Sequence, residues 1–374
     1  MYIKDFSVEI WMNEFETTAK YNLAETCVES ITVEQLLDYS PNKEQAIEAI
    51  MKMKMDYGDI EGSDILRKEI AKLVEKDINI HNITITHGAA GANHLVYETL
   101  IDKNDHVIVF IPGYQQHYSI PEALGAKVDC IEMGLEDGFQ PNIAELKRLV
   151  NSNTKAICLT NPNNPTGATV PTSILKEIVE IAEENDAYLI CDEVYRGLHH
   201  KDGFTTSVID LYDKAISTGS FSKAYSLAGL RLGWIIGPEE FIGNVNKHRD
   251  YSTISCSKII EYLGCIALKN KDKILERNLK LVSDNIKILD AWVNKMEHIT
   301  YVKPTAGTTA FLKYDYDITS EELCRDLIAQ TGVMLVPGSC FEMEGYLRIG
   351  YANNTQILID GLAEFEKYLI KKFG

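Results

Sequence analysis

A short serine-rich segment of the sequence places an amine among groups that bind anions. Residues 219–223 read Gly-Ser-Phe-Ser-Lys, and residues 229–231 read Gly-Leu-Arg. Ser220, Ser222 and Arg231 could together offer several hydrogen-bond donors to a phosphate group. Lys223 lies among them and, as a primary amine, could form an imine with a carbonyl compound. A single lysine in such a loop normally faces solvent, so this interpretation depends on the combination.

Polar residues also follow two apolar runs of the kind that form buried strands. Asp192 ends the run at residues 188–191, where a carboxylate is costly unless a cation or a hydrogen-bond donor meets it. Asn164 stands in N-P-N-N-P-T-G at residues 161–167, where two prolines and a glycine restrict the backbone and orient the side chain. Capping of the next helix by Asp192, or a purely structural turn around Asn164, would explain the same residues.

Small residues and an aromatic residue follow two further predicted strands. The sequence H-G-A-A-G-A at residues 87–92 would let the backbone at Ala89 and Ala90 approach an anion, because free N–H groups and the dipole at a helix start bind phosphate. Tyr114, after the strand predicted at residues 107–111, could stack on a flat ring. A tight strand-to-helix turn and ordinary aromatic packing are the alternatives for these two segments.

The elements that carry these segments alternate along the chain. Short apolar runs typical of buried parallel strands occupy residues 107–111, 156–159, 188–191 and 234–236. Residues 80–86 also read as a strand, and one-sided apolar stripes predict helices around residues 92–100 and 174–182. The alternation predicts an α/β fold with a mostly parallel sheet sandwiched by helices. Ligands of such sheets bind beyond the carboxyl ends of the strands, where the polar segments lie.

The length of the chain, 374 residues, predicts more than one structural unit. Its C-terminal part mixes extended segments, such as residues 309–312 and 346–350, with helices, which indicates a smaller α+β domain. We therefore expect an N-terminal arm at residues 1–45 that packs on the small domain, a large domain at residues 46–270 and a small domain at residues 271–374.

Composition narrows the class of protein. Lys and Arg number 37 against 55 Asp and Glu, and the net charge of −18 disfavours binding to nucleic acid or to an anionic membrane. No apolar stretch is long enough to span a membrane, and the N-terminus lacks the apolar run of a signal peptide. The eight cysteines include no C-x-x-C pair and the nine histidines show no metal-ligand spacing. We therefore predict a cytoplasmic protein without a disulfide framework or a metal site.

Together, the motifs resemble those of the class I/II aminotransferases, which are fold-type I enzymes that depend on pyridoxal 5′-phosphate. The matching segments are Y-G-D-I-E-G-S-D-I-L-R at residues 57–67, G-A-A-G-A at 88–92, P-G-Y at 112–114, N-P-N-N-P-T-G at 161–167, D-E-V-Y at 192–195, S-F-S-K at 220–223, G-L-R-L-G-W at 229–234 and L-R-I-G-Y at 347–351. Their order, spacing and chemical type agree jointly, so the resemblance is specific. It implies a large cofactor-binding domain and a smaller α+β domain.

The resemblance also implies residue roles. Lys223, Asp192 and Tyr195 would be catalytic: Lys223 would hold pyridoxal 5′-phosphate as a Schiff base and move a proton, while Asp192 would keep the pyridine nitrogen protonated. The other residues implied to bind the cofactor are Ala89, Ala90, Tyr114, Asn164, Ser220, Ser222 and Arg231. Arg348 would bind the α-carboxylate of the substrate, and Asn164 is implied to contact the substrate as well as the cofactor. Tyr57 would reach the phosphate of a neighbouring subunit, which implies a homodimer with shared active sites.

The N-terminal arm departs from the family pattern in the region that normally contacts the substrate side chain. Relatives carry a glycine-containing turn, often followed by Glu-Pro, whereas residues 21–27 here read Y-N-L-A-E-T-C. The side chains of Gln115, Gln116 and His117 are polar where those of many relatives are apolar. We hypothesise that Glu9 or Glu25, with these groups, receives a cationic or polar substrate side chain. Solvent-exposed surface glutamates are the alternative.

The predicted function is transfer of an amino group between an L-amino acid and a 2-oxo acid. The alternative is a pyridoxal-phosphate-dependent lyase or cyclase that catalyses elimination, replacement or capreomycidine-synthase-like cyclisation, because both reactions start from a carbanion at the same carbon. A regulatory protein that uses this fold as a ligand sensor would carry a basic helical domain before residue 57, and that segment does not read as one. Small-molecule amino and oxo acids are therefore the expected partners.

Overall fold

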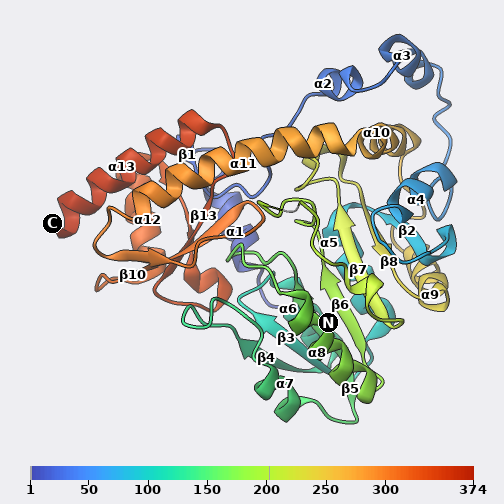
Figure 1. The fold of residues 1–374 in the computed structure, drawn as a ribbon, viewed down its shortest axis with the longest axis horizontal. Helices are drawn as coiled ribbons and strands as arrows, with labels where there is room; N and C mark the ends of the chain where they lie inside the picture. Colours follow the sequence, from blue (N-terminus) through green and yellow to red (C-terminus); the bar gives the residue numbers. More distant parts are fainter. Residues whose placement is uncertain (1, 202) are drawn as a thin grey trace.

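A seven-stranded sheet forms the centre of the larger part of the molecule in the computed structural model, which describes residues 2–201 and 203–374 (Figure 1). In sheet order its strands are β2 (Ile83–Thr86), β8 (Gly233–Ile236), β7 (Ala215–Ser220), β6 (Tyr188–Asp192), β5 (Thr154–Thr160), β3 (His106–Ile111) and β4 (Lys127–Glu132). The strands from β7 to β4 pair in parallel, and β8 pairs antiparallel with both of its neighbours. The predicted mostly parallel sheet is therefore confirmed.

Two strand predictions were wrong in part. Residues 234–236 form a buried strand, but the strand runs antiparallel to its neighbours. The prediction of a parallel strand was wrong because an unbroken apolar run indicates burial on both faces and does not indicate direction. Residues 80–86 form a strand only from Ile83. The preceding Ile80–Asn82 segment is a short 3₁₀ helix, η1, because the side chain of Asn79 caps it by accepting from the His81 N–H.

Helices cover both faces of this sheet because successive strand residues point to opposite sides. Val107 and Val109 of β3 pack in one core, with α5 (Gly88–Leu100), α6 (Gln116–Leu124) and α9 (Glu239–Arg249). Ile108 and Phe110 belong to the core on the other face. The remaining helices of residues 60–270 are α4 (Asp64–Ala71), α7 (Ile143–Leu149), α8 (Thr172–Glu184) and α10 (Lys258–Lys269), with the 3₁₀ helices η2 (Val208–Asp210) and η3 (Ala228–Leu230).

A four-stranded antiparallel sheet organises the C-terminal part of the chain. Its order is β12 (Val336–Pro337), β13 (Tyr346–Gly350), β10 (Thr309–Tyr314) and β9 (Ile299–Tyr301). The helices here are α11 (Lys271–Val293), α12 (Ser320–Thr331), the 3₁₀ helix η4 (Gly338–Phe341) and α13 (Thr355–Phe373). The long helix α11 runs from α10 toward this sheet (Figure 1). The proposed boundary at residue 270 falls at Asn270, between α10 and α11, which supports the proposed division.

The N-terminal segment packs on both parts of the molecule. It contains α1 (Ser7–Phe15), β1 (Tyr21–Asn22), α2 (Val33–Asp38) and α3 (Lys43–Met51). Strand β1 pairs with β11 (Val333–Met334), and Trp11 Nε1 donates to the Leu335 carbonyl over 2.8 Å. These contacts join the first part of the arm to the C-terminal part, whereas α2 packs beside α10. Within residues 2–201 and 203–374, no helix is long and apolar enough to cross a membrane.

Candidate active site

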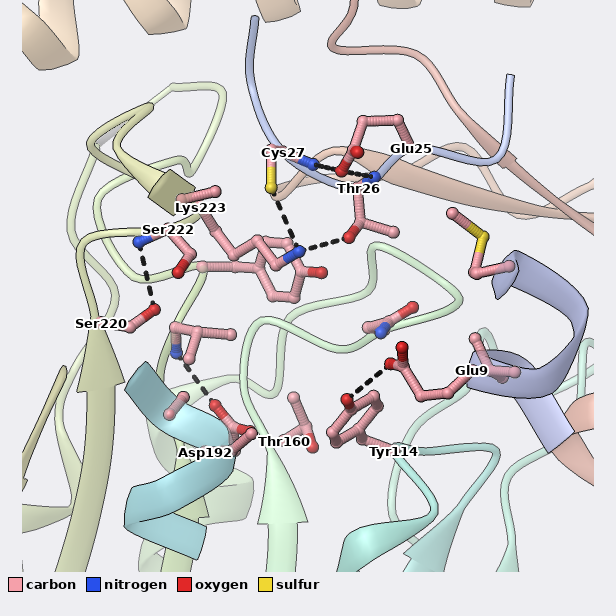
Figure 2. A pocket seen from close by; sticks show the side chains of 18 of the residues that line it. Glu9, Glu25, Thr26, Cys27, Tyr114, Thr160, Asp192, Ser220, Ser222 and Lys223 are labelled. Carbon is pink, nitrogen blue, oxygen red and sulfur yellow. Dashed lines mark hydrogen bonds between the residues drawn. The ribbon is translucent and has the colours of Figure 1, made fainter. Parts of the chain in front are cut away.

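Thirteen predicted residues meet in one cavity of about 380 Å³, which lies beyond the carboxyl ends of the parallel strands (Figure 2). Parallel strands end at the same sheet edge, so the segments after β3, β5, β6 and β7 converge although they are far apart in the sequence. The predicted residues that line this cavity are Glu9, Glu25, Ala89, Ala90, Tyr114, Asn164, Asp192, Tyr195, Ser220, Ser222, Lys223, Arg231 and Arg348.

Tyr57 lies outside the cavity. Its side chain is 77% exposed and lines a separate surface hollow with Gly58, His87, Cys256 and Lys258. The resemblance implied that Tyr57 contacts the phosphate in a second subunit. Its position in its own chain does not test that role, which stays a prediction.

Lys223 directs its amine into the cavity against the N-terminal arm. Its Nζ donates to Thr26 Oγ1 over 2.5 Å and to Cys27 Sγ over 3.4 Å (Figure 2). Burial lowers the pKa of Lys223, but Cys27, Tyr195 and Glu25 outweigh this effect and raise the pKa above the ordinary value. The arm thus covers the amine and keeps it protonated in the absence of a carbonyl partner.

Asp192 is buried at the end of β6, with only 3% of its surface exposed. The Val194 N–H donates to its Oδ1 and Asn93 Nδ2 donates to its Oδ2, both over 3.1 Å. His117 Nε2 lies 3.5 Å from Oδ2, and Tyr97 OH holds the other ring nitrogen at 2.9 Å. These groups offset the cost of burying the Asp192 carboxylate, which the sequence predicted at the end of a buried strand.

His117 titrates above its ordinary range. Burial lowers the pKa of His117, but Cys158 and Asp192 outweigh burial and raise that pKa to about 10. A protonated imidazole at this position places a positive charge 3.5 Å from the Asp192 carboxylate.

The start of α5 and the loop after β7 form a cradle of anion-binding groups. Ala89 and Ala90 lie in the first turn of α5, where backbone N–H groups are free. Ser220, Ser222 and Arg231 line the same side of the cavity, and Ser220 Oγ accepts from the Ser222 N–H over 3.3 Å. A Cβ atom at position 88 would come within 2.9 Å of Arg231 Nη2, so glycine there leaves the guanidinium room beside the helix start.

Arg348 comes from β13 of the small sheet and is only 2% exposed. Its Nη2 donates to the Ala24 carbonyl over 3.0 Å, and its Nη1 lies 3.4 Å from Asn164 Oδ1. Its Nε is buried without a hydrogen-bond partner among the residues that the structure describes. Burial lowers the pKa of the Arg348 guanidinium. A buried cation with a free donor is a ready site for a carboxylate.

The side chains after Tyr114 are not arranged as hypothesised. Gln115 donates to the Asp5 carbonyl over 2.7 Å, and Gln116 donates to the Ala90 carbonyl over 3.1 Å. His117 contacts Asp192. None of the three is among the residues that line the cavity. Helix α6 begins at Gln116 and directs these side chains toward their neighbours in the fold. Their proposed contact with the substrate is therefore wrong.

Sequence reasoning missed several residues of the site. Asn93 was detectable in principle, because it lies one helical turn after Ala89 and faces the same sheet edge. Thr26, Cys27, Met12 and Glu16 also line the cavity. They arrive there through the folding of the arm across the sheet edge, which leaves no local pattern in the sequence.

The cavity combines an amine, a buried carboxylate and the start of a helix that can bind an anion, and it lies at the edge of a mostly parallel sheet with helices on both faces. This combination defines an enzyme that holds a phosphorylated carbonyl cofactor. Comparisons with known proteins agree. Residues 33–365 match the family model of aminotransferase class I and II. Aspartate aminotransferase of Thermotoga maritima is 30% identical, over 88% of this chain and 87% of that protein. Capreomycidine synthase of Streptomyces vinaceus is 28% identical, over 97% and 93%.

A solved structure extends this agreement to the whole fold. The crystal structure of a pyridoxal-phosphate-dependent aminotransferase from Streptococcus suis matches with a TM-score of 0.95 and 38% identity, over 99% of each chain. The chain therefore belongs to the aminotransferase class I and II family, as its motifs indicated, and its cofactor is pyridoxal 5′-phosphate. The predicted fold class and enzyme class are confirmed.

The donor set of the cavity fits this cofactor. The hydroxyls of Ser220 and Ser222 and the guanidinium of Arg231 stand beside the first turn of α5 and would hold the phosphate. Asp192 is buried and would face a ring nitrogen, while Lys223 supplies the amine for the carbonyl carbon. The volume lies within the range of small-molecule sites, roughly 300–1,000 Å³.

Proposed function

We propose that the protein transfers an amino group between an L-amino acid and a 2-oxo acid, with Lys223 as the amine that holds the cofactor and moves the proton. The observation that carries this proposal is the meeting of Lys223, Asp192 and Arg348 around one cavity, although they come from three different strands or loops. Each supplies one requirement of the reaction: a proton carrier, an anion for the ring nitrogen and a clamp for the substrate carboxylate.

The residues of the chain divide the work. When bound, pyridoxal 5′-phosphate supplies an electron-withdrawing ring that stabilises negative charge on the substrate α-carbon. Arg348 binds the α-carboxylate through its fork of donors and so fixes the α-carbon relative to the Lys223 Nζ. Nζ would take the proton from the substrate α-carbon and deliver it, across the intervening nitrogen, to the carbon that the cofactor contributes as its carbonyl. Asp192, which accepts from Asn93 and lies beside His117, would keep a proton on the ring nitrogen.

Tyr195 and Asn164 complete the cofactor side of the proposal. Tyr195 is buried and lines the cavity, and burial raises the pKa of its hydroxyl, so the group is a hydrogen-bond donor at neutral pH. Asn164 lines the cavity beside Arg348, with its Oδ1 3.4 Å from the Arg348 Nη1. We assign both to the phenolate oxygen of the cofactor, and we assign Tyr114 to its ring face.

The same proposal includes a homodimer in the cytoplasm. Tyr57 and Met55 are exposed large side chains that line one hollow, a composition suited to contact with a second copy of the chain. The placement in the cytoplasm is supported by the cysteines, all eight of which are free thiols.

The decisive experiment traps the cofactor on the protein. Borohydride reduction of the purified holoenzyme followed by peptide mass spectrometry should place the cofactor mass on Lys223. The Lys223→Ala variant should show no trapped cofactor, whereas Lys247→Ala, which removes an exposed lysine of α9, should behave as wild type. Cofactor trapped in the Lys223→Ala variant at the wild-type level would refute the assignment.

A lyase or cyclase remains the second candidate, because capreomycidine synthase matches over nearly the whole chain. The two reactions differ in their products. Transamination converts the bound cofactor completely to its amino form when an amino acid is added alone. Elimination releases ammonia and a keto acid without an acceptor, and the absorbance spectrum of the cofactor afterwards returns to that of the enzyme before the amino acid was added.

A further inference from the structure

The wall of the cavity that faces the strand ends is acidic. Helix α1 presents Glu9 and Met12 to the cavity, its C-cap residue Glu16 follows at helical spacing, and the arm adds Glu25. Figure 2 shows Glu9 reaching from α1 toward Tyr114, and Glu25 on the arm above Lys223. Glu9 Oε1 accepts from the neutral Tyr114 hydroxyl over 2.9 Å, and Glu25 Oε1 accepts from two backbone N–H groups.

These carboxylates lack a cation of their own. Across the part of the chain that the structure describes, none of Glu9, Glu16 and Glu25 forms an ion pair within 4.0 Å, and Glu16 has no hydrogen-bond partner. Burial and the negative charges of Glu25 and Glu9 raise the pKa of Glu16. Three carboxylates thus gather on one wall of the cavity, where Glu9 and Glu16 are exposed and the cation that acts on Glu25 and Glu16 is Lys223, the reacting amine.

The cations that line the cavity already have other tasks. Arg231 stands in the phosphate cradle and Lys223 is the reacting amine. Arg348 has a buried Nε without a partner, an independent sign that a carboxylate of the ligand binds there. An α-amino acid with its amine at Lys223 and its α-carboxylate at Arg348 must direct its side chain toward the remaining wall, formed by α1 and the arm.

We infer that the amino-acid substrate carries a positively charged side chain, a terminal ammonium or guanidinium as in ornithine, lysine or arginine, which Glu9, Glu16 and Glu25 bind. This inference rests on the proposed function. Val8 and Met12 line the same wall and would contact the aliphatic stem, since such side chains bury their methylenes and leave the charged end in a polar setting. A side-chain carboxylate would meet three like charges, and none of the described lining residues offers it a free cation.

The test compares amino acids of similar shape that differ in charge: citrulline matches arginine in length, and norleucine is one atom shorter than lysine. The holoenzyme is mixed with arginine or citrulline, and with lysine or norleucine, and the change of cofactor absorbance gives both the rate of the half-reaction and the equilibrium binding constant. We expect each cationic member to exceed its neutral partner by at least about tenfold in kcat/KM, and the preference to shrink as salt rises. Aspartate and glutamate should bind more weakly than either cationic amino acid.

Variants on α1 tie the preference to the acidic wall. Glu16→Gln should lower the ratio of arginine to citrulline roughly two- to fivefold, the range for a partly exposed charge, and adding Glu9→Gln should lower it further. The matched control is Glu14→Gln, on the same helix but paired with Arg325 and outside the cavity, which should leave the ratio unchanged.

Each result decides between separate claims. The inference is overturned if kcat/KM is equal for arginine and citrulline, or if the ratio of the two is unchanged in the double variant. In either case normal turnover of citrulline would leave the proposed function standing. If no amino acid changes the spectrum of the bound cofactor, the proposed function itself fails, and the inference fails with it.

Discussion

The guanidinium of Arg348 is the sharpest point at which to test the site. Replacement by lysine keeps the positive charge and much of the length but removes the fork that grips both oxygens of a carboxylate. Arg348 is almost fully buried and has an unpartnered Nε, so water cannot replace the lost donor. The variant should therefore bind the substrate carboxylate with one strong hydrogen bond where the wild type uses two.

The size of the effect follows from the energy of that bond. A hydrogen bond to a charged group contributes about 1.5–3 kcal/mol, and each 1.36 kcal/mol changes a rate about tenfold. Arg348→Lys should lower kcat/KM for an amino acid by about 10- to 150-fold. Arg348→Gln, which also removes the charge, should cost about 3–5 kcal/mol, or roughly 150- to 5,000-fold.

The assay is the single-turnover change of cofactor absorbance as a function of amino-acid concentration, with simple amines as a second substrate series. Amines lack the α-carboxylate, so the loss should vanish for them. Arg325→Lys serves as the control, because Arg325 is an exposed arginine paired with Glu14. An equal loss for amines and amino acids would refute the assignment of Arg348 to the carboxylate.

Three further expectations follow from the geometry. Arg231→Gln should raise the dissociation constant of the cofactor by about tenfold or more in titration of the cofactor-free protein, and an unchanged constant would remove Arg231 from the phosphate cradle. Because the pKa of His117 is raised to about 10 in the folded state, its charge contributes stability that is complete below about pH 6.5 and is lost as pH rises toward 10. The difference in unfolding free energy between wild type and His117→Gln, from urea denaturation, should therefore be larger at pH 6 than at pH 10; a constant difference would contradict this. Gly350→Ala would bring a Cβ within 1.8 Å of the Glu25 carbonyl, so it should cost about 1–3 kcal/mol in thermal or urea unfolding and reduce activity, whereas Gly243→Ala in α9 meets no atom within 4 Å and should be neutral or stabilising.

The sequence alone determined the family and the edge of the sheet at which the cavity lies. These properties are encoded by neighbouring residues: an apolar run followed by Asp192, a serine-rich loop around Lys223, and small residues at the start of a helix. A parallel sheet then brings such segments together by its topology, so each residue could be placed from its position after a strand.

Only the tertiary structure decided how the cavity is closed and what surrounds its charges. The antiparallel direction of β8, the contact of Thr26 with Lys223 and the approach of His117 to Asp192 join residues that are far apart in the chain or on different elements. Such contacts depend on how whole elements pack, and packing leaves no periodic pattern in the sequence. The acidic wall formed by α1 and the arm is also decided by the tertiary structure. In the sequence Glu16 cannot be told from any surface glutamate, and only the packing of α1 places it at the cavity.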